Sequence, residues 1–302
     1  MQTKRTAPAS LTAGIPRPNL YRLSQPFLDV VHSRGLGLQG LRLVHLIAHA
    51  VCRHVPNWHN LSVHQPEDGD RQECLAFRRR LGLERSRDNR ALEDGIAELS
   101  KTDLVDWISF EHDHHWLSWR LNDALFDLLF DQPYGHFDIA QLGRFGTPLD
   151  LMIYGEVGII RDMRQPAVSL ALAGYGASLH RSPDWSRLRP DLIRALQQTA
   201  ALHDCGFFLQ LECRGTRRGI DAATLRARTA RSRWSWPALT GKPEGIPVRK
   251  VLLIDAGRCR ETTQKAASAE AQEFFGVEPE TSRKNVTERE EGAEVPSSGR
   301  CG

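Results

Sequence analysis

The sequence lacks the features of a membrane-spanning or secreted protein. Its most apolar uncharged stretches, residues 43–52 and 167–179, are shorter than the roughly 20 residues that a membrane span requires. No apolar segment follows the first positive charges, Lys4 and Arg5, as it would in a secretory signal. These absences predict a protein with neither a membrane span nor a signal segment.

Cysteine is scarce and irregularly spaced. The 302 residues include six cysteines, with no Cys-x-x-Cys pair and no short regular spacing, which excludes zinc ribbons and disulfide-rich scaffolds. In a chain of this length without a secretory signal, we expect reduced thiols and a cytoplasmic location. Because one domain usually takes about 100 to 200 residues, the length predicts two modest domains and an additional segment.

Motifs for catalysis and metal binding are incomplete. The cluster from His112 to His115 is expected at the tip of a β-hairpin, where solvent exposure provides no enclosing ligand shell for zinc. His45 and His49 are four residues apart on a predicted helix, but Leu46 stands where a zincin needs its glutamate. We therefore interpret the cluster as a polar hairpin tip and the pair as core or interface residues, and predict no catalytic residue, no metal and no cofactor.

Residues 35–40 spell Gly-x-Gly-x-x-Gly just before a predicted helix, where backbone N–H groups could hold a pyrophosphate. A dinucleotide site also needs a parallel strand after that helix. Residues 55–70 are instead polar and contain two prolines. We interpret the glycines as a flexible start of the helix.

Charge is distributed unevenly along the chain. Residues 261–302 contain nine glutamates against five basic residues, whereas residues 214–233 contain seven arginines against Asp221 alone. A cluster of this density is typical of a solvated surface or of a surface that binds a polyanion. The basic segment therefore makes nucleic acid a candidate partner.

The first half of the chain has three segments of helical periodicity followed by two β-rich runs. The predicted elements are helices at 36–54, 72–81 and 86–99, strands at 104–110 and 116–121, and a connecting helix at 122–130. Ser86 is suited to cap the third helix. The order helix, helix, helix, hairpin predicts a winged-helix domain over residues 36–132.

The second half shows a related order. The predicted elements are a short strand at 137–139, a helix at 148–163 that begins with a proline, a strand at 167–172, a helix at 185–203, a strand at 207–213 and a basic loop at 214–219. This order predicts a second winged-helix domain over residues 133–235. The two halves show no clear sequence match to each other, so only the order of elements indicates a duplication.

The ends of the chain have few large apolar residues in a periodic pattern. Residues 1–35 contain four prolines and predict an irregular arm. Residues 236–302 predict a linker and a largely disordered acidic tail, because they offer little apolar surface to offset chain entropy. The predicted fold is therefore α+β and mainly helical, with two winged-helix domains in series and a disordered acidic C-terminal tail.

In a winged helix, the third helix enters the major groove and the hairpin lies against the backbone or the minor groove. Basic residues occur at the third helix in both halves and at the predicted hairpin in the second. The candidate DNA-binding residues are Arg85, Arg87 and Arg90 in the first domain and Arg187, Arg189, Arg194, Gln197, Arg214, Arg217 and Arg218 in the second.

Three segments of the second half carry a family resemblance. These are Thr147-Pro148-Leu149-Asp150-Leu151-Met152-Ile153-Tyr154, Arg164-Gln165-Pro166 and Leu192-Ile193-Arg194-Ala195-Leu196. With the tandem order of elements, the chain resembles the plasmid replication initiator (Rep) proteins over about residues 37–235, most strongly from 137 to 219. The sequence departs from that pattern in its short second hairpin after Cys213.

The resemblance implies a non-enzymatic protein that binds double-stranded DNA at repeated origin sites and recruits the host initiator and the replicative helicase. It also implies that one winged helix can serve in forming a homodimer. A winged-helix transcription repressor is the alternative, and it would prefer one palindrome over several direct repeats. A third class, an adaptor that uses winged helices for protein contacts, predicts negligible affinity for DNA.

Overall fold

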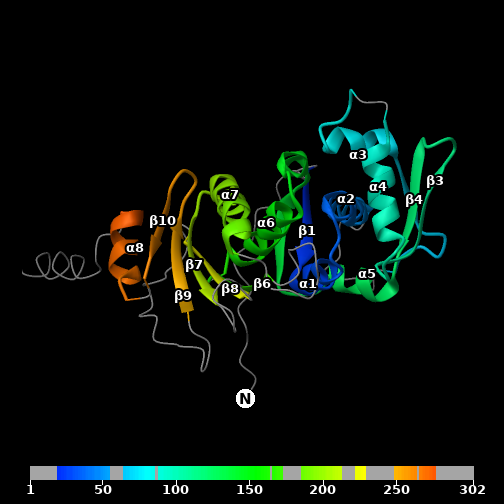
Figure 1. Ribbon diagram of the computed structural model, residues 1–302. Helices are drawn as coiled ribbons and strands as arrows, with labels where there is room; N and C mark the ends of the chain where they lie inside the picture. Colours follow the sequence, from blue (N-terminus) through cyan, green and yellow to red (C-terminus); the bar gives the residue numbers. More distant parts are fainter. Residues whose placement is uncertain are drawn as a thin grey trace, which may run out of the picture.

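The computed structural model describes residues 19–54, 64–85, 88–163, 165–172, 185–212, 222–228, 248–263 and 265–276. Figure 1 shows α8 at one end of the molecule and the β3–β4 hairpin at the other, with α6, β1 and α2 between them. Every strand pair in the described part of the chain is antiparallel. The fold is a mixture of helices and antiparallel sheets.

The first half contains the predicted helices and hairpin. Its elements are α2 (Leu38–His54), β2 (Asp70–Glu73), α3 (Cys74–Arg80), α4 (Arg90–Leu99), β3 (Val105–Glu111), β4 (Trp116–Leu121) and α5 (Asp123–Leu129). The sheet order is β2-β4-β3, and α2 packs on α4. Phe77 and Trp119 are fully buried between helices and sheet, with ring centroids 5.7 Å apart. Strand β2 was not predicted from the sequence, because it is short and polar.

The start of α4 differs from the prediction. The helix begins at Arg90, with Asn89 at the N-cap position, whereas Ser86 lies outside the described residues. The predicted cap at Ser86 is therefore wrong.

The second half contains the predicted helices and strands and two elements that were not predicted. The predicted ones are β5 (Tyr134–Asp138), α6 (Pro148–Ile160), β6 (Ala167–Ala171), α7 (Trp185–His203) and β7 (Gly206–Glu212), and the others are η1 (Ile139–Arg144) and β8 (Ala222–Arg228). Strand β8 pairs with β7 from Ala222 to Arg228 and, on its other side, with β6. The second hairpin, which looks short in the sequence, therefore has two seven-residue strands. Its connection, residues 213–221, lies outside the described part.

The predicted irregular arm is wrong for its second part. Residues 20–33 form β1 (Leu20–Ser24) and α1 (Gln25–Ser33). The Ser24 side chain accepts a hydrogen bond from the backbone of Phe27, and Pro26 stands in the first turn of the helix, where its missing N–H costs nothing. Strand β1 pairs with β5, so Tyr21 lies opposite Phe137. Pro26, which contributed to the prediction of an irregular arm, thus stands at the start of a helix.

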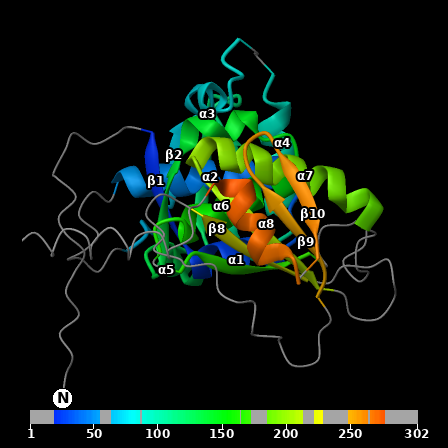
Figure 2. The ribbon, with the colours of Figure 1, turned by 90° about the vertical axis from the view of Figure 1, so that its left-hand side faces the viewer.

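The predicted disordered tail is wrong for residues 248–276. They form β9 (Val248–Ile254), β10 (Cys259–Thr262) and α8 (Ala267–Phe275), and extend the second sheet to the order β10-β9-β7-β8-β6. Figure 2 shows α8 lying on the sheet beside β9. Phe274 is only 5% exposed and belongs to a small buried cluster with Phe208 and Leu253. The sheet supplies burial that this segment's own composition does not reveal.

The two halves meet across a shared core. One cluster of buried residues extends from β1 and α2 through α6 to α7. At the contact of α1 with α6, the buried Glu156 accepts a hydrogen bond from Gln25 at 2.9 Å and lies 3.2 Å from His32. The predicted domain boundary at residues 132 and 133 stays a prediction. No helix in the described ranges is long and apolar enough to cross a bilayer.

Candidate nucleic-acid interface

Helix α7 carries the densest set of predicted site residues. Its inner face buries Leu188, Leu192 and Leu196, while Arg187 and Arg194 are exposed on the opposite side. The helix packs on α6 and directly precedes the β7–β8 hairpin. In the winged helix that the sequence predicts, the groove-entering helix has this place in the order of elements.

Arg194 is fixed on the surface by two carboxylates. Its guanidinium lies 3.3 Å from Asp150 and 3.2 Å from Asp191, and donates a hydrogen bond to the Thr147 hydroxyl at 3.2 Å. The Asp150 side chain is 2% exposed, whereas Arg194 keeps 50% exposure. Asp150 therefore holds an arginine whose other side faces solvent.

The remaining candidates on α7 differ in their surroundings. Arg189 lies 3.7 Å from Glu261 of β10 and so contacts the segment that was predicted to be disordered. Gln197 is partly buried, and its neighbour Gln198 donates a hydrogen bond to the backbone carbonyl of Arg144 at 3.1 Å. The structure thus brings Arg187 and Arg194 together on one exposed face, with Gln197 at its margin.

The first half differs from the second at the equivalent helix. Arg90 is 79% exposed at the start of α4, only 3.7 Å from Asp88, and Arg85 is exposed in the preceding loop. Further along α4, the exposed side chains include Glu93 and Asp94. Arg87 lies outside the described residues. The predicted basic helix is therefore basic only at its first residue.

A second basic region lies at the end of α3. The last turn of this helix is Arg78-Arg79-Arg80, and Arg78 donates a hydrogen bond to Asn89 ahead of α4 at 3.1 Å. Burial and the like charge of Arg53, at the end of α2, both lower the pKa of Arg80. Sequence reasoning missed this region, although three consecutive arginines were a visible signal.

The 3₁₀ helix η1 connects this region to α7. A Cβ atom at Gly143 would lie 2.8 Å from the backbone oxygen of Leu81, just after α3. The next residue, Arg144, is exposed, and its carbonyl accepts the hydrogen bond from Gln198. The end of α3, η1 and α7 are thus successive neighbours, and Figure 1 shows α3 and α7 toward the same side of the molecule.

Of the arginine-rich segment 214–233, the structure describes residues 222–228. Arg214, Arg217 and Arg218 lie outside the described residues. Arg228, on β8, donates a hydrogen bond to the Phe275 carbonyl at 2.8 Å, and burial lowers its pKa. Arg228 therefore caps the C-terminal end of α8.

The glycine pattern at the start of α2 has a structural cause. The Glu98 carboxylate of α4 accepts a hydrogen bond from the Gly40 N–H at 3.0 Å. A Cβ atom at Gly37 would lie 2.6 Å from the same carboxylate. The protein's own carboxylate thus occupies the N-terminus of the helix, where a pyrophosphate would have to bind.

The histidines that the sequence singled out lie in the β3–β4 turn and in the core. His112, Asp113 and His114 all have positive φ in the β3–β4 turn, and the His114 ring stacks on Phe110 at 4.5 Å. His45 is fully buried, with its Nδ1 atom 2.5 Å from the Tyr21 hydroxyl, and burial lowers its pKa to about 3. Within the described ranges, no three His, Cys, Asp or Glu side chains are grouped to hold a metal.

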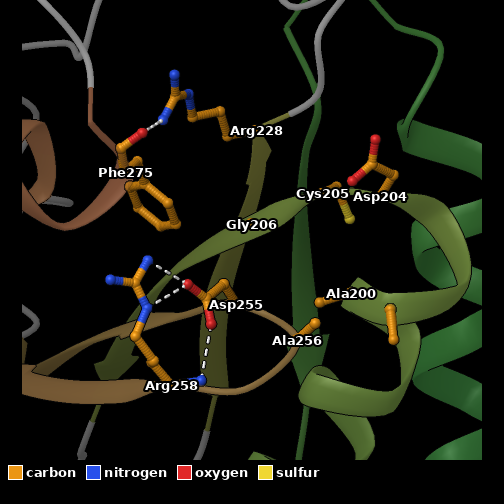
Figure 3. Close-up of a pocket in the computed structure, with 10 residues that line it drawn as sticks. Ala200, Asp204, Cys205, Gly206, Arg228, Asp255, Ala256, Arg258 and Phe275 are labelled. Carbon is orange, nitrogen blue, oxygen red and sulfur yellow. Dashed lines mark hydrogen bonds and ion pairs between the residues drawn. The ribbon is translucent and has the colours of Figure 1, made fainter.

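One open groove of about 680 Å³ lies between the end of α7, the β9–β10 turn and the end of α8. Figure 3 shows its charged side chains. Arg258 is paired with Asp255 at 2.6 Å and also donates to the Phe274 carbonyl at 2.9 Å. Arg228 and Arg258 thus donate hydrogen bonds to carbonyl groups at the end of α8, so the groove is part of the packing of that helix.

Comparison with known proteins finds a similarity to solved structures. No family model and no curated protein matches the sequence. A solved structure described as "Crystal structure of Pi initiator protein in complex with iteron DNA" aligns with 72% of this chain and 100% of that chain, at 10% sequence identity and a TM-score of 0.48. A similarity of this size establishes neither fold nor function for the present chain.

Proposed function

We propose that the protein is a sequence-specific DNA-binding protein built from two winged helices in series, and that it initiates plasmid replication. The observation that carries this proposal is a repeated arrangement. In the first half, α2 packs on α4 beside a sheet of order β2-β4-β3; in the second, α6 packs on α7 beside strands of order β6-β8-β7. In both halves, the second helix of the packed pair directly precedes a hairpin, as the groove-entering helix does in a winged helix.

The surface of α7 supports DNA as the partner. Arg187 and Arg194 are exposed on the face away from the core, and Gln197 lies beside them. Arginine can bind guanine or a phosphate in a bidentate way, and glutamine can bind adenine. In this proposal the protein acts by binding and is not an enzyme.

The sequence resemblance to Rep proteins favours a replication initiator over the alternative, a winged-helix transcription repressor. In this proposal the protein binds repeated origin sites on double-stranded DNA, with the host initiator and the replicative helicase as further partners. A homodimer is a further expectation from the same resemblance.

The test is to select duplexes that bind the full chain from fragments of the plasmid or chromosome that carries the gene. An initiator is expected to select a fragment with several direct repeats beside an AT-rich segment. A single palindrome overlapping a promoter would support the repressor instead. Binding to no duplex above the level of an unrelated basic protein would contradict both, and would favour an adaptor that contacts proteins.

A further inference from the structure

The two halves present different charges at equivalent helices. Under the proposed function, on which this inference rests, α4 and α7 occupy the same position in the two winged helices. Helix α7 exposes Arg187 and Arg194, whereas α4 exposes Glu93 and Asp94. Because duplex DNA carries one negative charge per about 1.7 Å of its axis, exposed carboxylates on a helix in the groove would be repelled.

Helix α4 has little positive charge to offset these carboxylates. Arg90 is the one basic residue of the helix, and it lies 3.7 Å from Asp88. Glu93 is 50% exposed and lies 3.7 Å from His114 in the hairpin turn. Glu98 is directed to the N-terminus of α2. The surface of α4 is therefore unsuited to lie against phosphate groups.

The end of α3 has the opposite character. Arg79 is exposed and Arg80 half-buried, and the exposed Arg53 lies near enough to affect the ionisation of Arg80. The Nη1 atom of Arg80 is buried and has no hydrogen-bond partner among the residues that the structure describes. Two like charges beside an unsatisfied donor are unfavourable unless an anion binds there.

We infer that Arg53, Arg79 and Arg80 form a phosphate-binding surface through which the first half holds the DNA backbone, and that α4 reads no bases. Base recognition then belongs to α7. Arg144 lies between the end of α3 and α7, so the basic residues follow one path along both halves. Arginines in the last turn of a helix also interact favourably with its dipole, and the experiment below distinguishes that role from phosphate binding.

The experiment measures equilibrium binding of the full chain to the tightest selected duplex and to a random duplex of equal length, between about 50 and 200 mM salt. Arg79→Ala and Arg80→Gln are each expected to lower affinity several-fold for both duplexes, by the same factor. Each should also reduce the salt slope, which is the slope of the logarithm of the binding constant against the logarithm of the salt concentration, by about one unit per lost phosphate contact. Unchanged affinity and slope in both variants would overturn the inference. So would a loss confined to the selected duplex, because that is the behaviour of base contacts.

Arg71→Ala is the matched control. This arginine is also exposed in the first half, on β2, where it lies over the Trp116 ring at 5.2 Å. It should leave both affinities unchanged. Thermal melting of each variant shows whether it folds, and Arg79→Ala tests the surface without altering the half-buried Arg80.

The role of α4 is tested with Glu93→Gln and Asp94→Asn. Both are expected to keep the preference for the selected duplex over the random one. Loss of that preference would show that these carboxylates accept hydrogen bonds from bases, and would overturn the assignment. If the unmodified chain binds no duplex, the proposed function itself fails. If Arg187→Ala lowers affinity but Arg79→Ala and Arg80→Gln do not, only the present inference fails.

Discussion

The guanidinium of Arg194 lies 3.3 Å from the carboxylate of Asp150, which also closes the capping box at the start of α6. One Asp150 oxygen accepts hydrogen bonds from the backbone of Gly146 and Thr147 at 2.9 and 2.8 Å. The other faces Arg194. A buried carboxylate thus joins the N-terminus of α6 to the exposed face of α7.

Asp150→Ala should lower the free energy of unfolding by about 1 to 3 kcal/mol, because it leaves two backbone donors without their acceptor. Urea denaturation measures the loss. Asp191→Ala is the control, since Asp191 pairs with the same arginine but is 52% exposed. It should change stability by less than about 1 kcal/mol. Equal losses in the two variants would show that the capping box contributes little.

The packing of α8 predicts that the C-terminal segment matters for stability. Phe274→Ala should lower the free energy of unfolding by about 3 kcal/mol, because a buried ring is replaced by a cavity. Deleting residues 264–302 should lower the melting temperature, contrary to what composition alone suggests for the tail. Glu273→Ala, at a side chain that is 71% exposed, is the control. An unchanged melting temperature after the deletion would mean that the sheet does not depend on α8.

The sequence predicted those helices and strands whose own residues show a helical periodicity or a β-rich run. The periodicity of α2 and α7 and the β-rich runs of β3 and β4 predicted their positions to within a few residues. Strands β1 and β2 were missed because each pairs with a strand far away in the chain, β5 and β4 respectively. Strand β10 pairs with the neighbouring β9 but was missed because it is short and polar. A short polar strand such as β2 (Asp70–Glu73) has no alternation of apolar and polar residues by which its sequence could be recognised.

The candidate site was predictable only in part. Arg187 and Arg194 could be placed on an outer face, since Leu188 and Leu192 mark the inner one. The acidic surface of α4 was visible in the sequence, but the prediction rested on the three arginines at the start of the expected helix, Arg85, Arg87 and Arg90. The contact of Arg189 with Glu261 joins residues 72 positions apart, and no local pattern indicates it.

The buried histidines predict loss of stability in acid. Burial lowers the pKa of His45 to about 3, and burial with the nearby Arg161 lowers that of His203 to about 4. Below the ordinary histidine pKa of about 6.5, the unfolded chain binds protons that the folded chain does not, so stability falls as the pH decreases. For His45 the loss should approach 1.4 kcal/mol per pH unit between about pH 6 and pH 4.

His45→Gln should make the unfolding free energy less dependent on pH over that range, as measured by urea denaturation at several pH values. Its stability at pH 7 is expected to be lower, because the contact with the Tyr21 hydroxyl changes. His112→Gln, in the exposed hairpin turn, should leave the pH dependence unchanged. If His45→Gln retains the dependence of the unmodified chain, another group causes the acid sensitivity.

The exposed face of α7 predicts a difference between base and phosphate contacts. Arg187 is exposed and has no ion pair within the described residues, whereas Arg194 is held by Asp150. Holding a guanidinium in place lowers the entropy lost when it binds a base edge. Arg194→Ala should therefore lower affinity for the selected duplex by about 1 to 3 kcal/mol and leave random duplex nearly unaffected.

Arg187→Ala should instead weaken both duplexes alike and flatten the salt slope by about one unit, as a phosphate contact does. Gln197→Ala tests the margin of the same face and should resemble Arg194→Ala if its amide reaches a base. Competition binding on the two duplexes measures all three variants, with the exposed Lys265→Ala, beside α8, as the control. Equal losses on both duplexes for Arg194→Ala would make it a backbone contact. No loss on either duplex in any of the three variants would remove α7 from the interface, because the face that carries the proposed base recognition would then touch no DNA.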